Sequence, residues 1–253
     1  MIWTAIPPMR PQMAARALPD FSRRAHEAEW MDDEAVGFET FEGCLRDLAK
    51  ANAVTMTHRP TLAFLARLDQ AGLWPKDRPL VIVDVGSGYG DGLRRIARWA
   101  ARRGLAARLI GIDRNPFAAR AAGAASDSAP AIAWTTCDAF DYDGPADVIL
   151  SSLFTHHLDD AQLVRFLAWM DRRAAVGWFV NDLERHPLSW AGFALLARVA
   201  RWHPFVGHDG PVSIRRAFRP PDWRGYLEAA GVAGAEVRAR FPFRLCVSKV
   251  AGV

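Results

Sequence analysis

The chain has 253 residues, of which 51% are hydrophobic, 24% are charged and 11% are aromatic. This length and composition suit one large domain with a sizeable hydrophobic core, and they exclude a disordered chain. The 32 basic and 28 acidic residues give a formal net charge of +4, which by itself does not indicate nucleic-acid binding.

The cysteines and the N-terminus point to a reducing compartment. Cys44, Cys137 and Cys246 lack CxxC spacing, so we expect neither a disulfide framework nor a zinc cluster. Prolines interrupt the first residues, so no signal peptide is expected. No stretch reaches the roughly 18 apolar residues of a membrane span. We therefore predict a cytoplasmic bacterial protein without a membrane span.

Residues 1–76 form the first predicted part, which is either a helical lid or the arm of a homodimer. Residues 1–20 are rich in proline and are expected to be irregular, whereas residues 21–75 are expected to be helical. Apolar residues recur at helical spacing over 38–54 and 59–71, and these two stretches carry the helical prediction.

Residues 77–253 are predicted to form the core, in which strands alternate with helices. This alternation predicts an α/β fold, a Rossmann-like doubly wound sheet with parallel core strands. The tail segments 235–241 and 243–250 are expected to pair as an antiparallel hairpin. We expect residues 202–216 to form a loop over the mouth of a pocket. The predicted strands are 80–86, 108–113, 131–136, 147–153 and 176–182, and the predicted helices are 91–104, 116–126, 160–173, 187–202 and 220–230.

A glycine-rich turn follows the first of these strands. It begins at Asp84 and runs through Gly86, Gly88 and Gly90 into a helix. Glycines are needed where the backbone turns tightly and a ligand approaches main-chain atoms. The spacing differs from the GxGxxG dinucleotide fingerprint, and the P-loop pattern is absent. The acid before the loop disfavours a pyrophosphate and favours a cationic ligand.

Two further acids follow the next two strands. Asp113 stands where an acid accepts hydrogen bonds from ribose hydroxyls. Asp138, with Ala139 beside it, can accept the exocyclic amine of adenine. One such acid alone is more often a helix cap or turn residue. Three acids in these places favour a nucleoside ligand.

Segment 80–182 resembles the class I S-adenosylmethionine (SAM)-dependent methyltransferases. DVGSGYG matches their glycine-rich motif, GID their ribose-binding acid and CDAF their adenine-contacting segment. The resemblance implies a seven-stranded sheet with an antiparallel terminal strand, SAM as cofactor and S-adenosylhomocysteine (SAH) as product. It places Asp84 near the methionine part, Asp113 at the ribose and Asp138 at the adenine. The implied cofactor contacts are Asp84, Gly86, Ser87, Gly88, Gly90, Asp113, Arg114, Asp138, Ala139 and Ser151.

The chain is also similar to bacterial methyltransferases encoded beside polyketide synthases and flavin hydroxylases. EWMDDE, LFTHHLDD, NDLERHPL and SIRRAF carry this likeness. The similarity implies a small-molecule enzyme of secondary metabolism that acts on phenolic products. Insertions around 183–220 would then form the acceptor side.

A pair of histidines follows the fourth predicted strand. His156 and His157 have the ordinary pKa of a base that removes a proton from a phenol, and we prefer His157 slightly. In an extended loop the two would not both face the same way. The alternative is that the pair only shapes the loop, before a helix capped by Asp159 or Asp160.

Further candidates follow the fifth predicted strand. Asp182 or His186 could position an acceptor hydroxyl, or they could belong to an ion pair with Arg185 and to a helix start. His203 or His208 is a third candidate, the latter with the next residue as its orienting carboxylate. Acids and an asparagine grouped at metal-binding spacing are missing from this rim, so we expect no metal.

We therefore predict a SAM-dependent methyltransferase that acts on a small aromatic or polyketide-like acceptor. The acceptor atom is a phenolic hydroxyl, the reaction is an in-line displacement, and a histidine is the general base. The alternatives are C-methylation of a quinone-type ring, RNA methylation and a SAM-binding protein without activity. The scattered arginines disfavour nucleic acid, and aromatic residues around the lid suit a flat apolar substrate.

Overall fold

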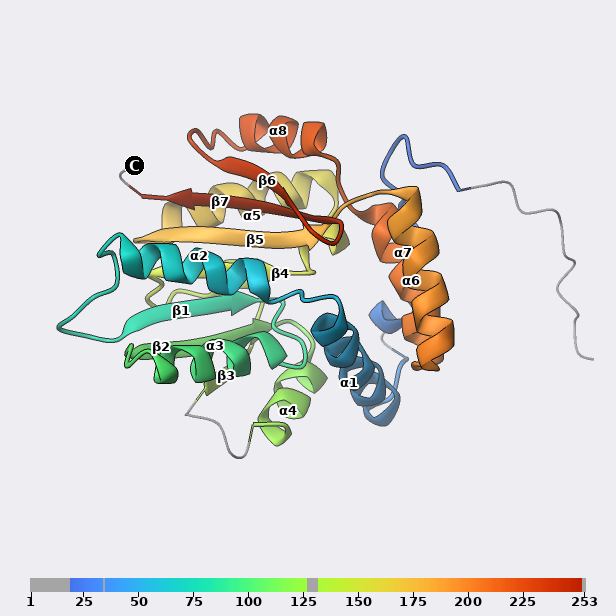
Figure 1. The fold of residues 1–253 in the computed structure, drawn as a ribbon, viewed down its shortest axis with the longest axis horizontal. Helices are drawn as coiled ribbons and strands as arrows, with labels where there is room; N and C mark the ends of the chain where they lie inside the picture. Colours follow the sequence, from blue (N-terminus) through green and yellow to red (C-terminus); the bar gives the residue numbers. More distant parts are fainter. Residues whose placement is uncertain (1–18, 34, 127–131, 252–253) are drawn as a thin grey trace, which may run out of the picture.

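One seven-stranded sheet organises the chain, and helices cover both of its faces (Figure 1). The computed structural model describes residues 19–33, 35–126 and 132–251. Residues 1–18 of the predicted irregular segment 1–20 lie outside these ranges. Residue 131 of the third predicted strand also lies outside them. The strands are β1 Leu80–Val85, β2 Ala107–Asp113, β3 Ile132–Thr136, β4 Val148–Ser152, β5 Gly177–Leu183, β6 Glu236–Arg240 and β7 Arg244–Val250.

The strand order is β3-β2-β1-β4-β5-β7-β6. The strands β1 to β5 are parallel to their neighbours, whereas β7 runs antiparallel to both β5 and β6. This arrangement confirms the predicted Rossmann-like doubly wound sheet with an antiparallel terminal strand. It also contains the predicted tail hairpin, which is formed by β6 and β7.

Proline fixes the start of several helices. The helices over 116–124, 187–200, 204–216 and 220–229 each begin at a proline. The ring presets the first turn, where a missing N–H costs no intrahelical hydrogen bond. The helices are α1 Phe38–Val54, α2 Arg59–Gln70, α3 Asp91–Arg102, α4 Pro116–Ala124, α5 Asp160–Arg173, α6 Pro187–Ala200, α7 Pro204–Arg216 and α8 Pro220–Ala229, with short 3₁₀ turns at η1 Trp30–Asp32, η2 Ala139–Asp141 and η3 Thr155–His157.

The strand β1 lies in the interior of the sheet, and its side chains are buried on both faces. Leu80 and Ile82 pack toward α2 and α3, whereas Val81 and Val83 pack toward α5 and α8. Successive side chains of a strand point to opposite faces, so a strand covered on both faces is apolar throughout. The parallel strands end at one edge of the sheet, and α1, α6 and α7 stand beyond that edge (Figure 1).

The predicted loop over 202–216 is wrong, because most of it is the helix α7. Gly207, Gly210 and Pro211 lower the intrinsic helix propensity, and this misled the sequence interpretation. Packing outweighs propensity here, since Val206, Val212 and Ile214 are buried. Gly210 also has a packing role, because an added Cβ would overlap the ring of Phe193 on α6.

We expect substitution by alanine to have opposite effects on the free energy of unfolding at the two glycines of α7. Gly210→Ala should lower the free energy of unfolding by about 1–3 kcal/mol, because the new methyl group pushes α6 away. Gly207→Ala should raise it by about 0.5–1 kcal/mol, because that position is open and alanine favours the helix. Thermal and denaturant unfolding measure both changes. Equal shifts of the two variants would contradict the packing role of Gly210.

The segment 19–33, which we call the N-terminal arm, is not the helix expected from residue 21 onward. Apart from the short turn η1, it is extended or irregular, and the first long helix begins at Phe38. Buried arginines hold it instead: Nε of Arg185 donates to the carbonyl of Phe21 at 3.0 Å, and Nη2 of Arg24 donates to the carbonyl of Leu158 at 2.9 Å. These contacts join residues far apart in sequence, so local patterns do not reveal them.

Across the described ranges, none of the helices has the length and apolar character that crossing a membrane would require. The three cysteines are unpaired; Cys44 and Cys246 are buried, and Cys137 is half-buried.

Candidate active site

A cavity of about 1300 Å³ lies beyond the carboxyl ends of the parallel strands. The glycine loop after β1 forms one part of its wall, and α1, α6, α7 and the N-terminal arm form further parts of it. Its floor includes the ends of β1 and β4, which lie side by side although α3, β2, α4 and β3 separate them in the chain. This is the place where open α/β sheets bind ligands.

The glycine loop needs glycine for two reasons. Gly86 and Gly88 have φ angles of +72° and +49°, in the region that other residues avoid. A Cβ on Gly86 would also lie 2.6 Å from the ring of Phe154. The loop therefore brings bare backbone to the cavity wall, as a ligand that contacts main-chain atoms requires. Gly90 lies outside the cavity lining and is the N-cap residue before α3, with a φ of +72°.

Asp84 brings an uncompensated acid to the cavity. Its side chain is 7% exposed, and no hydrogen bond or ion pair reaches its carboxylate from the described part of the chain. Burial, together with the charges of Asp91 and Asp113, raises the pKa of Asp84 to about 8. A buried carboxylate without a counter-charge is costly, so this site favours a cationic ligand.

The other acids named for the cofactor also line this cavity. Asp113 accepts the backbone N–H groups of Gly88 and Asn115, each at 2.9 Å, and its oxygens can accept further hydrogen bonds. Asp138 caps η2 through the N–H of Phe140. Ser87, Arg114 and Ala139 line the cavity as well. Ser151 does not: it is buried inside β4, and Ser152 occupies the cavity wall instead.

The segment after β4 brings to the cavity a histidine fixed by a buried carboxylate. Nδ1 of His156 lies 2.7 Å from Oδ1 of Asp182, at the end of β5. The other oxygen of Asp182 accepts the hydroxyl of Thr155 and the backbone N–H of His156. Burial raises the pKa of Asp182, but the charge and hydrogen bond of His156, with the other hydrogen bonds to the carboxylate, outweigh burial. The resulting pKa is about 2. The carboxylate is therefore ionised and orients the ring.

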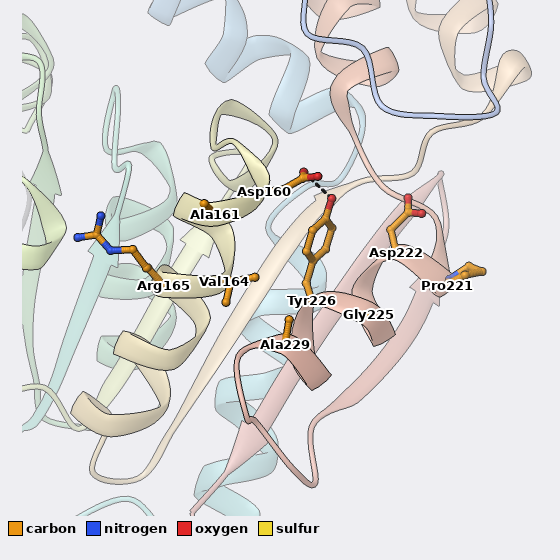
Figure 2. A pocket seen from close by; sticks show the side chains of 9 residues that line it. All are labelled: Asp160, Ala161, Val164, Arg165, Pro221, Asp222, Gly225, Tyr226 and Ala229. Carbon is orange, nitrogen blue, oxygen red and sulfur yellow. Dashed lines mark hydrogen bonds between the residues drawn. The ribbon is translucent and has the colours of Figure 1, made fainter.

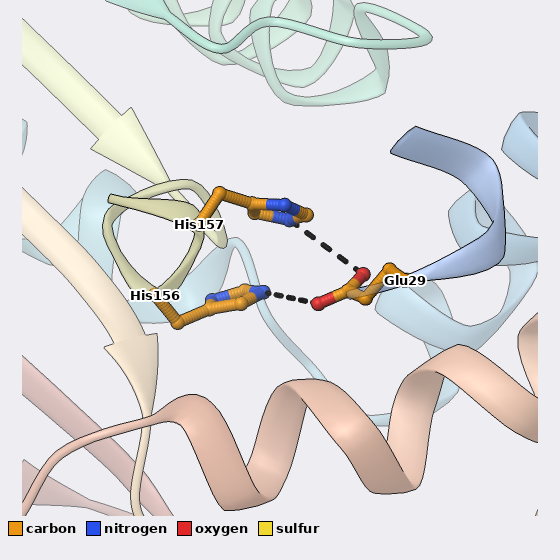
Figure 3. Close-up of side chains that lie close together, drawn as sticks. All are labelled: Glu29, His156 and His157. Carbon is orange, nitrogen blue, oxygen red and sulfur yellow. Dashed lines mark ion pairs between the residues drawn. The ribbon is translucent and has the colours of Figure 1, made fainter. Parts of the chain in front are cut away.

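The N-terminal arm adds Glu29 to this histidine (Figure 3). The carboxylate of Glu29 lies 3.7 Å from Nε2 of His156 and 3.7 Å from Nε2 of His157. Burial lowers the pKa of His157, but the charges of Glu29 and Asp32 outweigh it and raise the pKa to about 9. The two rings face the same carboxylate, contrary to our expectation, because residues 155–157 form a 3₁₀ turn and not an extended loop.

Sequence reasoning missed the residues that bring the arm to the site. The hydroxyl of Ser213 donates to Glu29 at 2.9 Å, and Asp209 accepts the backbone N–H groups of Trp30 and Met31. Arg216 donates to the carbonyls of His156 and His157. The only signals were EWMDDE and SIRRAF, which contain Glu29 and Arg216 but do not show that they meet.

The remaining candidates lie elsewhere. His186 and His203 cap α6 and α7 through the N–H groups of Leu188 and Phe205, and neither lines the cavity. His208 does pair with Asp209, at 2.7 Å, but its ring stacks on Trp30 outside the cavity lining. The predicted helix cap before α5 is Asp159, which forms a capping box.

A second hollow lies between α5 and α8, where the hydroxyl of Tyr226 donates to Asp160 at 2.6 Å (Figure 2). Its volume is about 590 Å³, and it lies apart from the glycine loop and from the histidine pair. None of the residues predicted for the cofactor or for catalysis lines it.

Comparisons with known proteins agree with this geometry. Residues 82–177, less than half of the chain, match a family described as a methyltransferase domain. Magnesium protoporphyrin IX methyltransferase from Synechocystis PCC 6803, solved with SAM, aligns with 86% of this chain and 99% of its own, at 13% identity and a TM-score of 0.54. A plantazolicin methyltransferase, solved with a desmethyl-plantazolicin analog and SAH, aligns over 87% of both chains at 14% identity and a TM-score of 0.53. At these identities the structural likeness establishes the fold, while no curated protein matches the sequence.

Proposed function

We propose that this chain, which is a SAM-dependent methyltransferase, methylates a hydroxyl oxygen of a small aromatic acceptor. The observation that carries the proposal is the dyad of His156 and Asp182, whose histidine lines the same cavity as the glycine loop. A neutral hydroxyl is a poor nucleophile, and a base oriented beside it makes methyl transfer efficient. The fixed ring supplies that base, and the cavity supplies the orientation.

The glycine-loop side of the cavity fits SAM. When bound, SAM supplies an electrophilic methyl group carried on a sulfonium. The buried carboxylate of Asp84 suits the positive charge, and Asp113 has acceptor capacity for ribose hydroxyls. The structural neighbours solved with SAM and SAH support the same cofactor and product.

We assign the base to His156. Its Nδ1 is bonded to Asp182, which leaves Nε2 free of hydrogen bonds from the described residues. His157, with its pKa raised to about 9, is an imidazolium at neutral pH and cannot take a proton. Its positive charge would instead stabilise the phenolate that His156 creates. Asp182 is a positioning residue, which keeps the ring in the required tautomer.

The acceptor side suits a flat apolar molecule. Residues of α1, α6 and α7 and of the turn before β7 line it, and such a cover would exclude the water that solvates the nucleophile. Two structurally similar proteins, magnesium protoporphyrin IX methyltransferase and the plantazolicin methyltransferase, support a small-molecule acceptor over nucleic acid. The apolar lining includes Leu48, Phe193, Leu196, Val206, Ile214 and Phe243.

The arm is proposed as a lid and not as a dimer arm. Its Glu29 completes the site of its own chain, and Arg24 and Arg185 tie it down within the same chain. We also propose a cytoplasmic protein, because the three cysteines of the chain, Cys44, Cys137 and Cys246, are unpaired.

SAM binding should release protons below pH 8. The pKa of Asp84 is about 8 in the free protein, and a neighbouring cation lowers it. At pH 7 roughly 0.9 of a proton should therefore leave on binding, and the affinity should rise with pH until about 8. Calorimetry in buffers of different ionisation enthalpy measures this number. Asp84→Asn should abolish the release, and proton uptake by the unaltered protein would contradict the assignment.

Methyl transfer to a panel of acceptors tests the proposed reaction. SAM-loaded protein is incubated with phenols, hydroxyquinones and tRNA, and each product is weighed by mass spectrometry. A methyl gain on a phenol is the expected result. Transfer to tRNA alone would replace the proposal by RNA modification, and SAM binding without any transfer would indicate a protein that only binds the cofactor.

A further inference from the structure

Arg244 is a buried cation on the acceptor side of the cavity. It is the first residue of β7, it is 5% exposed, and it lines the same cavity as His156. Burial lowers the pKa of Arg244 to about 10, so the guanidinium stays charged at neutral pH. A buried charge needs a partner of opposite charge, because leaving water is costly.

The described residues give Arg244 no such partner. Nη2 donates to the hydroxyls of Thr55 and Thr57, at 3.1 and 2.7 Å, and both acceptors are neutral. Nη1 has no hydrogen-bond partner at all within the described part of the chain. Of the 28 acidic residues in the sequence, none with a described position forms an ion pair with it.

Asp182 is the acid whose charge acts most on Arg244, yet it is already satisfied. One of its oxygens lies against His156 Nδ1 and the N–H of Leu183, both at 2.7 Å. The other accepts the hydroxyl of Thr155 and the backbone N–H of His156. The guanidinium is therefore left without an anion, as the carboxylate of Asp84 is left without a cation.

The sheet separates these two charges. Asp84 lies on β1 and Arg244 on β7, with β4 and β5 between them. Three strand spacings alone put their backbones at least about 14 Å apart. Asp84 therefore belongs to the cofactor side of the cavity, and Arg244 belongs to the side where His156 and Asp182 lie.

We propose that Arg244 binds a carboxylate of the acceptor, so that the substrate is a hydroxy-aromatic acid. This inference rests on the proposed function, because it identifies the class of the acceptor that occupies the cavity. The planar guanidinium matches a carboxylate in charge and shape. The acid is held at Arg244 while its hydroxyl faces His156, which fixes which end of the molecule reacts.

Binding of matched acids and esters tests the proposal. The protein is saturated with SAH and titrated with 4-hydroxybenzoate, 3-hydroxy-2-naphthoate and the methyl ester of each. The unaltered protein should bind at least one acid about tenfold or more tightly than its ester. Arg244→Met should remove this preference while leaving the affinity for SAH unchanged, and Arg244→Lys should keep part of it.

Arg240→Met is the matched control. Arg240 lies opposite Arg244 in the β6–β7 pair but is exposed, so its loss should leave the preference intact. Thermal unfolding checks that each variant folds. Lack of any acid preference in the unaltered protein would overturn the proposal whether or not Arg244→Met folds, as would an unchanged preference in that variant.

The same titrations separate two sources of the carboxylate. SAH carries a carboxylate on its amino-acid part, so weaker SAH binding by Arg244→Met with an unchanged acid preference would assign Arg244 to the cofactor and overturn the proposal. Methyl transfer to neutral phenols without any acid preference would leave the proposed function standing and remove only this inference. Failure of the unaltered protein to bind SAH would overturn the proposed function, and this inference would fall with it.

Discussion

Replacing His156 with asparagine should lower kcat by a factor of about 10²–10⁴, the usual contribution of a general base. Asparagine keeps a donor that can bond Asp182 but cannot accept a proton. The affinity for SAM should change little, because His156 is not among the residues assigned to the cofactor and its ring is bonded to Asp182. Steady-state rates and SAM titrations on the same preparation measure both quantities.

His26→Asn is the control for this prediction, since His26 is an exposed histidine of the N-terminal arm. It should retain the full rate. If His156→Asn also retained the full rate, the dyad would have no part in the chemistry. A large loss of rate in His157→Asn alone would move the base to His157, against the raised pKa of that residue.

Asp84→Asn should change binding and stability in opposite directions. The affinity for SAM should fall by roughly 10²-fold, because the cation loses a buried charge partner. The ligand-free variant should be more stable at and above neutral pH. The pKa of Asp84 in the folded protein, about 8, lies above the ordinary value of 3.8, so folding loses stability as pH rises through this window, and asparagine removes that loss.

Calorimetry and thermal unfolding at pH 6 and pH 8 follow these two effects separately. Asp77→Asn removes a carboxylate from the exposed linker before β1 and should leave both quantities unchanged. The stability gain of Asp84→Asn should be larger at pH 8 than at pH 6. Equal affinity for SAM in the variant and the unaltered protein would remove Asp84 from the cofactor site.

The cofactor side could be predicted from sequence because its signals are local. The strand β1 is a continuous apolar run, and the loop after it needs glycine wherever φ is positive, as at Gly86. The following strands repeat the pattern of an acid at the carboxyl end. Each motif lies within a few residues of the strand that positions it, so one short window contains both.

The acceptor side is built from contacts between distant segments. Glu29 meets His156 only because buried arginines and Asp209 hold the arm across the site. Arg244 reaches the cavity because β7 inserts between β5 and β6. No periodicity or spacing encodes such pairings, which is why the sequence suggested histidines and acids there without showing which of them meet.

Transfer of an isotopically labelled methyl group tests the central claim most directly. The protein is loaded with SAM carrying ¹³C in its methyl group and given a hydroxy-aromatic acid, and the product is examined by ¹³C NMR. The account predicts that the label appears as a methoxy carbon on the former hydroxyl oxygen, and that His156→Asn abolishes this signal. A label on a ring carbon, or a product formed equally well by His156→Asn, would contradict the proposed O-methylation by the dyad of His156 and Asp182.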